Sequence, residues 1–344
     1  MIKSQLSKKQ AFCNYPFQRL KIDPEGNCAF CCFQRRETLG NILDSSLEEV
    51  WNSPIAKQVR KETLEGKLHR SCAIECCPFY HEKELKKVEF LEYDFPVQFE
   101  IDLPNTHCNI GGTSPTPSTA CLMCERASPN FKPHKDRINE VCEKIKPFMK
   151  FANGVHIQGI SEPFWKDRIF DIIEMAGIEH YKDKITISTT TNGTTLSDKR
   201  IERWLSYPNT CTTFSMDSAT PETYKKIRKL DAYNSVVKAL MKIAEKRKGL
   251  QYLYIHNNIN MLNIGEVEGM VELAAQAKVT EINFNPTYNL DGLVISNENA
   301  DLFKKAEDII IETAKRLDVK IGFVRKLTLD FEPEKLIQLK LIKV

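Results

Sequence analysis

The stretch that decides the fold joins a strand pattern to a cysteine-rich loop. It begins with Val97-Gln-Phe-Glu-Ile-Asp-Leu103 and continues as Pro104-Asn-Thr-His-Cys108. After residues rich in glycine, proline, serine and threonine it ends at Ala120-Cys-Leu-Met-Cys124. Three cysteines in one loop at the end of a strand can ligate three irons of a four-iron–four-sulfur cluster and leave the fourth iron open. From these cysteines alone, a zinc site completed by a ligand such as His107 is an open alternative.

Strand and helix patterns alternate from this loop onward. Such alternation predicts a parallel sheet with right-handed crossovers. About six units before the terminal strand favour an α/β partial barrel over a closed eight-unit one, with the site at the carboxyl ends of the strands. The predicted strands are 97–103, 155–158, 185–189, 211–216, 252–259, 281–285 and 320–324, and the predicted helices are 134–150, 164–176, 198–205, 221–244, 264–277 and 299–316.

The segment upstream of the barrel is small and loop-rich. A hairpin is predicted around 17–22 and 28–32, and Ser46-Leu-Glu-Glu49 is a capping box that opens a helix. Core burial alone cannot stabilise so small a piece, so we expect a bound metal to hold it together. The predicted domains are therefore 1–85, a linker at 86–96, and a barrel at 97–344.

Composition narrows the class of protein. The chain has 344 residues, 42% hydrophobic, with a net charge of +3, which predicts an ordinary core and gives no general attraction to nucleic acid. The polar start lacks an apolar signal stretch, and no run is long enough to span a membrane. We expect a cytoplasmic protein. In a reducing compartment the clustering of most of the twelve cysteines indicates metal binding rather than disulfides.

Four strings on successive predicted strands resemble the radical S-adenosylmethionine superfamily. They are Val155-His-Ile-Gln-Gly-Ile-Ser-Glu-Pro163, Thr190-Thr-Asn-Gly193, Phe214-Ser-Met-Asp217 and Glu281-Ile-Asn-Phe-Asn-Pro286. The resemblance implies a radical SAM barrel and an oxidoreductase or modifying enzyme. Such an enzyme cleaves S-adenosylmethionine reductively to a 5′-deoxyadenosyl radical, which abstracts hydrogen from a substrate. It also implies that Cys108, Cys121 and Cys124 hold the catalytic cluster.

The same resemblance implies residues that contact S-adenosylmethionine. Glu162 would take the amino group, and Gly159 would let the backbone approach closely. Arg228 would meet the carboxylate, and Met123 would pack at the adenine position. Ser215 and Asp217 would bind ribose hydroxyls, and Ser161 and Asn192 complete the predicted cofactor contacts.

Structural roles stay open for several of these residues. Glu162 could cap the helix that begins at Pro163, and Arg228 could be a solvated helix charge. Asn192-Gly193 suits a plain turn. His256, on the fifth predicted strand, is a candidate substrate-facing residue, with a satisfied core histidine as the favoured interpretation. The family spaces its first two cluster cysteines closely, whereas twelve residues, Asn109–Ala120, separate them here. This insertion is expected to form a lid over the cluster.

The upstream segment resembles an auxiliary-cluster module of the SPASM/twitch type. The strings Asp23-Pro-Glu-Gly26, Leu39-Gly-Asn-Ile42 and Glu48-Glu-Val-Trp-Asn52 carry the resemblance. It implies a second [4Fe-4S] cluster, although a zinc-binding appendage is an alternative. Cys28 falls on an ordinary strand position. The preferred ligands are Cys13, Cys31, Cys72 and Cys77, with Cys32 and Cys76 as alternatives.

The substrate is not identified by any motif. By analogy with the family, the leading expectation is a peptide, with reducing electrons from a donor such as flavodoxin or ferredoxin. A dehydrogenase or epimerase of a sugar or aminocyclitol is the second expectation, and a non-catalytic metal-binding scaffold is the third. Cys142 and Cys211 are expected to pack in the core.

Overall fold

The computed structural model divides the chain into two compact units that interleave along the sequence. Unit 1 comprises Met1–Pro104, Pro133–Gly159 and Arg168–Ile187, and unit 2 comprises Asn105–Lys132, Ile160–Asp167 and Ser188–Val344. The structure describes residues 7–34, 36–72, 77, 86–90, 95–116, 118–128, 130–287, 293–294 and 298–322. The units do not follow the predicted domain limits, which stay a prediction.

The main sheet of unit 1 joins the amino-terminal hairpin to the first strands of the β/α series. β2 pairs in parallel with β6, and β6 pairs in parallel with β7. On the other side β2, β3 and β4 pair antiparallel, which confirms the predicted hairpin. The start of β8 lies beside β7. The strands are β2 (Arg19–Ile22), β3 (Asn27–Ala29), β4 (Gly40–Asn41), β6 (Gln98–Asp102), β7 (Gly154–Gln158) and β8 (Thr186–Thr191).

Part of the predicted linker, 86–96, forms a strand instead. β5 (Lys86–Phe90) pairs antiparallel with β1 (Ser7–Ala11) in a separate two-stranded sheet. The linker was predicted from charged composition, which does not reveal pairing with a segment so far away in the sequence.

The helices of unit 1 begin at the predicted signals. Ser46 accepts a hydrogen bond from the Glu49 backbone N–H at 3.2 Å, and Glu49 accepts one from the Ser46 N–H at 2.8 Å, which confirms the capping box. Pro54 then starts a new helix, because proline suits a first turn but not a helix interior. The helices are α1 (Tyr15–Gln18), α2 (Leu47–Trp51), α3 (Pro54–Leu64), α5 (Ile138–Ile145) and α6 (Arg168–Met175).

A buried network of charges covers one face of the unit 1 sheet. Glu100, which is 1% exposed, pairs with Arg19 and accepts from Lys21 Nζ at 3.0 Å and Gln158 Nε2 at 2.6 Å. Burial raises the pKa of Glu100, but the charges of Lys21 and Arg19 outweigh it and lower the pKa to about 2. The carboxylate is therefore ionised at neutral pH.

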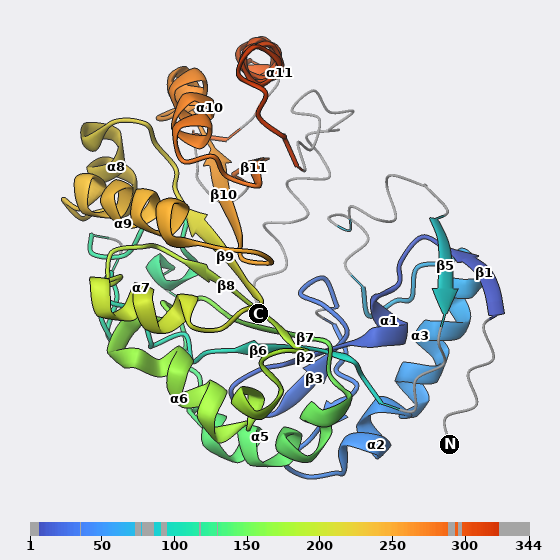
Figure 1. Ribbon diagram of the computed structural model, residues 1–344. Coiled ribbons are helices and arrows are strands. Elements are labelled where there is room, and N and C mark those ends of the chain that lie inside the picture. The colour runs from blue at the N-terminus through green and yellow to red at the C-terminus, as the bar shows by residue number, and fades with distance from the viewer. Residues whose placement is uncertain are drawn as a thin grey trace. The chain divides into compact units, whose positions relative to one another are not determined.

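Unit 2 repeats the β/α alternation in chain order. β8, β9, β10 and β11 are neighbours in that order, and β9 to β11 pair in parallel, which confirms the predicted parallel sheet. α10 and α11 lie side by side, as Figure 1 shows. The elements are β9 (Thr210–Ser215), β10 (Tyr252–Ile259), β11 (Glu281–Pro286), α7 (Asp198–Leu205), α8 (Pro221–Arg228), α9 (Tyr233–Lys246), α10 (Val267–Gln276) and α11 (Ala300–Leu317).

Two predicted helices are interrupted. The helix predicted over 221–244 divides at Lys229, whose left-handed φ of 58° ends α8. The helix predicted over 164–176 starts as a short 3-10 turn in which Lys166 and Asp167 also have positive φ values, and α6 follows. Of the predicted strand at 320–324, Ile321 forms one parallel bridge to Ile282, and 323–324 lie outside the described residues.

The sheet of unit 2 has one apolar and one polar face. Phe214, Ile255 and Phe284 are fully buried in the core under the helices. The alternate positions of the same strands are partly exposed, and each carries a polar side chain or a thiol. These positions, called here the polar face, are Cys211, Thr213, Ser215, Tyr254, His256, Asn258, Glu281, Asn283 and Asn285. Among the described residues, no helix is long and apolar enough to cross a membrane.

Candidate functional site

The three cysteines of the loop after β6 come together in unit 2. Cys108 and Cys121 are buried with Ile110 in one small cluster, and Met123 and Cys124 pack against it. The Cys124 N–H donates to the Cys121 carbonyl at 3.0 Å, which closes a turn between these two thiols. The insertion of twelve residues therefore leaves Cys108 beside the other two.

Burial makes two of these thiols, Cys108 and Cys124, weaker acids in the absence of a metal. It raises the pKa of Cys108 to about 12 and also raises the pKa of Cys124. A metal that binds them must displace the protons, which soft iron or zinc ions do. Among the described residues, no three His, Cys, Asp or Glu side chains are placed to hold a single metal ion.

Glu162 is fully buried, and three donors of unit 2 surround its carboxylate. Oε1 accepts from Thr191 Oγ1 at 2.6 Å and from the Phe164 N–H at 3.2 Å, and Oε2 accepts from the Asn192 N–H at 2.7 Å. The bond to Phe164 is a local contact in the turn before the 3-10 segment Trp165–Asp167, since no helix begins at Pro163. Burial nevertheless raises the pKa of Glu162, so a cation at Oε2 would favour its charged form.

Two predicted contact residues lie directly before Glu162. Ser161 Oγ is buried and has no hydrogen-bond partner among the described residues. Gly159 has a φ of +126°, a conformation that side chains rarely adopt. An unpaired buried hydroxyl beside a buried carboxylate fits a ligand that brings its own polar groups.

Asn192 forms the expected turn and also turns its amide toward the cysteines. Gly193 after it has a φ of +75°, and the Asn192 Nδ2 lies 3.9 Å from Cys108 Sγ and 3.1 Å from Asn109 Oδ1. This amide donates to Cys108, so Asn192 is more than part of a turn.

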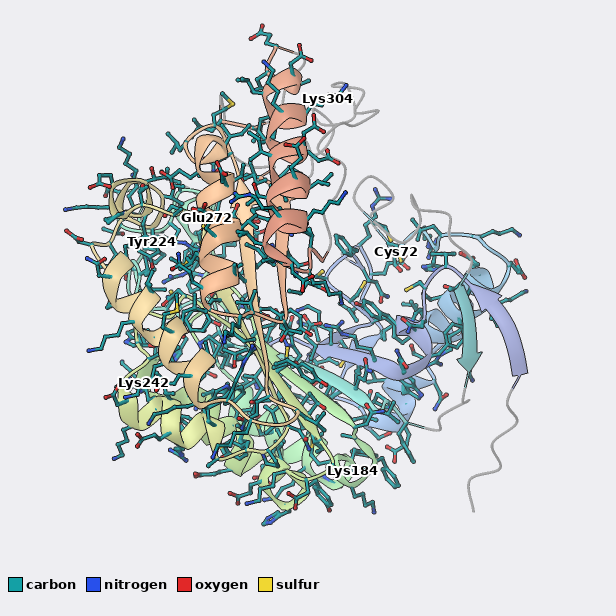
Figure 2. The ribbon with its side chains drawn as sticks, turned by 45° about the horizontal axis from the view of Figure 1, so that its top comes forward. Cys72, Lys184, Tyr224, Lys242, Glu272 and Lys304 are labelled. Atoms are coloured by element: carbon teal, nitrogen blue, oxygen red, sulfur yellow. The ribbon has the colours of Figure 1, made fainter. Side chains whose placement is uncertain are left out.

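Asp217 and Arg228 form a buried ion pair beside Cys121. Asp217 is 1% exposed, and its Oδ1 accepts from the Asn258 N–H at 2.9 Å. Burial lowers the pKa of Arg228, but Asp217, Cys121 and Tyr224 together outweigh burial and raise the pKa. Arg228 Nη1 lies 4.0 Å from Cys121 Sγ, so it is a buried charge and not a solvated one. Tyr224, labelled on α8 in Figure 2, is buried in the same unit, and its hydroxyl has no hydrogen-bond partner among the described residues.

Ser215 and His256 are register partners on the polar face. His256 is partly exposed, and its Nε2 lies 2.8 Å from Asn285 Nδ2. His256 therefore lies on the polar face and not in the apolar core, although its ring has the hydrogen-bond partner expected of a satisfied histidine. Cys211 is also partly exposed on this face, whereas Cys142 is fully buried as predicted.

Four cysteines of unit 1 line one pocket. They are the preferred auxiliary ligands Cys13, Cys31, Cys72 and Cys77, with aromatic side chains around them; Cys72 is labelled in Figure 2. Burial raises the pKa of Cys13 to about 12 and that of Cys72 to about 11. These four thiols fit the donor set of one iron–sulfur cluster.

The other amino-terminal cysteines are placed differently. Cys28 is buried and contacts the Gly26 carbonyl at 3.5 Å, Cys32 is exposed, and Cys76 lies outside the described residues.

Sequence reasoning missed two buried residues of the candidate site. Thr191 stands inside the quoted Thr-Asn-Gly turn, and its strand parity could have placed it inward. Arg126 follows the last cysteine by two residues and is 2% exposed, yet arginine there reads as an ordinary surface charge.

Comparison with known proteins agrees with this geometry. Residues 107–274 match the radical SAM superfamily, and residues 13–78 match SPASM, an iron–sulfur cluster-binding domain. No curated protein sequence matches the chain.

Two solved structures show the same fold. SuiB from Streptococcus suis bound to S-adenosylmethionine has a TM-score of 0.51 and 16% identity, over 93% of this chain and 72% of that chain. Hexahistidine-tagged anSMEcpe with bound AdoMet has a TM-score of 0.50 and 19% identity, over 66% of this chain and 61% of that chain. This chain therefore spans less than two thirds of the length of anSMEcpe.

The chain belongs to the radical S-adenosylmethionine superfamily, and a SPASM iron–sulfur cluster-binding domain precedes the barrel in its sequence. The predicted α/β radical SAM fold is thereby confirmed.

Proposed function

We propose that the protein is a radical S-adenosylmethionine enzyme with two [4Fe-4S] clusters that abstracts hydrogen from a peptide. Cys108, Cys121 and Cys124 hold the catalytic cluster in this proposal, and the four pocket cysteines of unit 1 hold the auxiliary one. The observation that carries it is the gathering of two buried thiols, Cys108 and Cys121, and the partly buried thiol of Cys124 beside buried Glu162 and the Asp217–Arg228 pair.

When bound, the catalytic cluster supplies the electron that cleaves S-adenosylmethionine to methionine and a 5′-deoxyadenosyl radical. The Glu162 carboxylate, held by Thr191 and Asn192, accepts from the ligand's ammonium group. Ser161 Oγ is a free donor beside it. Arg228 places a positive charge near the ligand's carboxylate, and Asp217 and Ser215 accept from the ribose hydroxyls.

The auxiliary site favours electron transfer over substrate binding. Four cysteines line its pocket, so every iron of a four-iron cluster can have a protein ligand. The auxiliary cluster would accept an electron from the substrate radical. Flavodoxin or ferredoxin would supply the electron that reduces the catalytic cluster.

A peptide substrate rests on analogy alone. anSMEcpe, with 18% identity to this chain and a TM-score of 0.50, has been solved with bound AdoMet and the Cp18Cys peptide. A dehydrogenase or epimerase of a sugar or aminocyclitol is the second candidate, and the polar face supports it. None of the nine residues of the polar face has an aliphatic side chain. The one carboxylate among them, that of Glu281, is already paired with Lys320 at 2.9 Å. Such a neutral hydrogen-bonding surface suits hydroxyl groups.

Anaerobic reconstitution with iron and sulfide tests the reaction. The parent should hold about eight irons, given four per cluster, and release 5′-deoxyadenosine with reductant and S-adenosylmethionine. A Cys108→Ala/Cys121→Ala/Cys124→Ala variant should hold about four and release none. Cys142→Ala, which removes a buried thiol far from both predicted sites in sequence, is the matched control and should behave as the parent.

Other outcomes identify the alternatives. Zinc in place of iron, or a fully loaded parent that releases no 5′-deoxyadenosine, would leave a metal-binding scaffold. To separate the substrate classes, deuterated peptides and deuterated sugars are offered in parallel. Deuterium in 5′-deoxyadenosine from the sugars alone would replace the peptide proposal with the second candidate.

A further inference from the structure

Arg126 is a buried cation in the middle of the cluster loop. It lies in the 3-10 turn Glu125–Ala127, directly after the last cluster cysteine, and is 2% exposed. Among the described residues, no carboxylate forms an ion pair with it. A buried guanidinium without an anion is costly, so its presence requires compensation from hydrogen bonds or from a bound negative group.

The guanidinium holds the start of the insertion. Nη1 donates to the Ile110 carbonyl at 2.7 Å, and Nη2 donates to the Gly112 carbonyl. Gly111 and Gly112 have φ values of +80° and +63°, a left-handed turn that directs these carbonyls to one side chain. Ile110 is in turn packed against Cys108 and Cys121. The two hydrogen bonds from the guanidinium, called here the fork, therefore connect the backbone just after Cys108 to the backbone just after Cys124.

Two of the three guanidinium nitrogens donate to the loop, and the third does not. Nε of Arg126 is buried and has no hydrogen-bond partner among the described residues. A bound cluster with its thiolates is an anion, and it would supply the compensation that the described residues lack.

We propose that Arg126 is the positioning residue of the catalytic cluster: its fork closes the expanded loop so that Cys108 reaches the cluster of Cys121 and Cys124, and its charge stabilises the reduced cluster. The inference rests on the proposed function and explains how a loop with twelve residues between its first two cysteines can present three thiols together. The insertion then acts as a part of the cluster's own support rather than as the predicted lid.

Two substitutions separate the fork from the charge. Arg126→Gln removes both, and Arg126→Lys keeps the charge but not the bidentate geometry. Arg316→Gln removes an exposed arginine of α11 that pairs with Glu268, and it is the matched control. Each variant is loaded anaerobically and assayed for iron after gel filtration, for the reduced-cluster electron paramagnetic resonance signal, and for the midpoint potential of the catalytic cluster.

The parent and the control should keep about eight irons. We expect Arg126→Gln to fall toward about four irons, with any remaining catalytic cluster at a more negative potential. Arg126→Lys should also lose iron, but its remaining cluster should keep a potential close to that of the parent. The auxiliary signal, retained in both variants, shows that the chain has folded.

Full iron and an unchanged potential in Arg126→Gln would overturn the inference. If both variants lose iron but keep the parent's midpoint potential, Arg126 supports the loop only structurally. That result would also overturn the proposed role of its charge. A parent without a catalytic cluster would instead refute the proposed function, so the two failures are distinguishable.

Discussion

Replacing Glu100 by glutamine tests the charge network on the unit 1 sheet. The side chain is 1% exposed, and its ordinary pKa of 4.5 is lowered to about 2 because Lys21 and Arg19 outweigh the effect of burial. By linkage, this lowering corresponds to about 3 kcal/mol of folding free energy at pH 7. Glu100→Gln keeps the shape but loses the charge, so we expect a loss of stability of about that size, within the range for breaking a buried pair.

The sign of the pKa change sets the pH dependence. A lowered carboxyl pKa contributes stability that is complete above 4.5 and is lost only as the pH falls toward about 2. The difference between the parent and Glu100→Gln should therefore be constant from about pH 6 to about pH 8. Urea unfolding of the cluster-loaded protein, followed by circular dichroism, measures it.

A surface pair provides the control for this experiment. Glu140 pairs with Arg137 in solvent, so Glu140→Gln should cause no measurable change. Equal free energies of unfolding for Glu100→Gln and the parent would refute this reasoning. A second contradicting result would be a parent whose free energy of unfolding falls between pH 6 and pH 8. That pattern would mean that burial dominates and raises the pKa of Glu100.

Three further predictions concern the site. Thr191→Val removes a 2.6 Å donor from buried Glu162, and we expect S-adenosylmethionine to bind the loaded enzyme at least about tenfold more weakly by calorimetry; equal affinity would contradict the role of Glu162. Gly193→Ala forces a φ of +75° and places a Cβ at 2.8 Å from Phe214 Cε1, so thermal unfolding should show a loss of about 1–3 kcal/mol, and an unchanged midpoint would refute the strain. Cys28→Ala should keep both clusters, because this thiol lies against the Gly26 carbonyl; a drop to about four irons would make Cys28 a ligand.

Local signals in the sequence predicted the elements and their order. The capping box at Ser46 and the alternation of strand and helix patterns need only neighbouring residues, so they could be read from the chain. The order of the motifs indicated the radical S-adenosylmethionine superfamily, and the clustered cysteines indicated metal binding. The family matches at residues 13–78 and 107–274 fall on the same segments.

Contacts between distant residues needed the tertiary structure. The parallel pairing of β2 with β6 leaves no local pattern, because it depends on backbone groups far apart in the chain. Among the seven amino-terminal cysteines the family resemblance favoured Cys13, Cys31, Cys72 and Cys77, but only the tertiary structure shows that these four line one pocket.

The site shows the same division between residue type and environment. Asp217 and Arg228 were both predicted as ligand contacts, but only the fold shows that they pair with each other beside Cys121. Arg126 carries no motif, and its importance comes from burial and from two carbonyls of the insertion. Sequence determined which chemical groups this protein has, while the tertiary structure decided which of them are desolvated together, and desolvation sets the strength of their interactions.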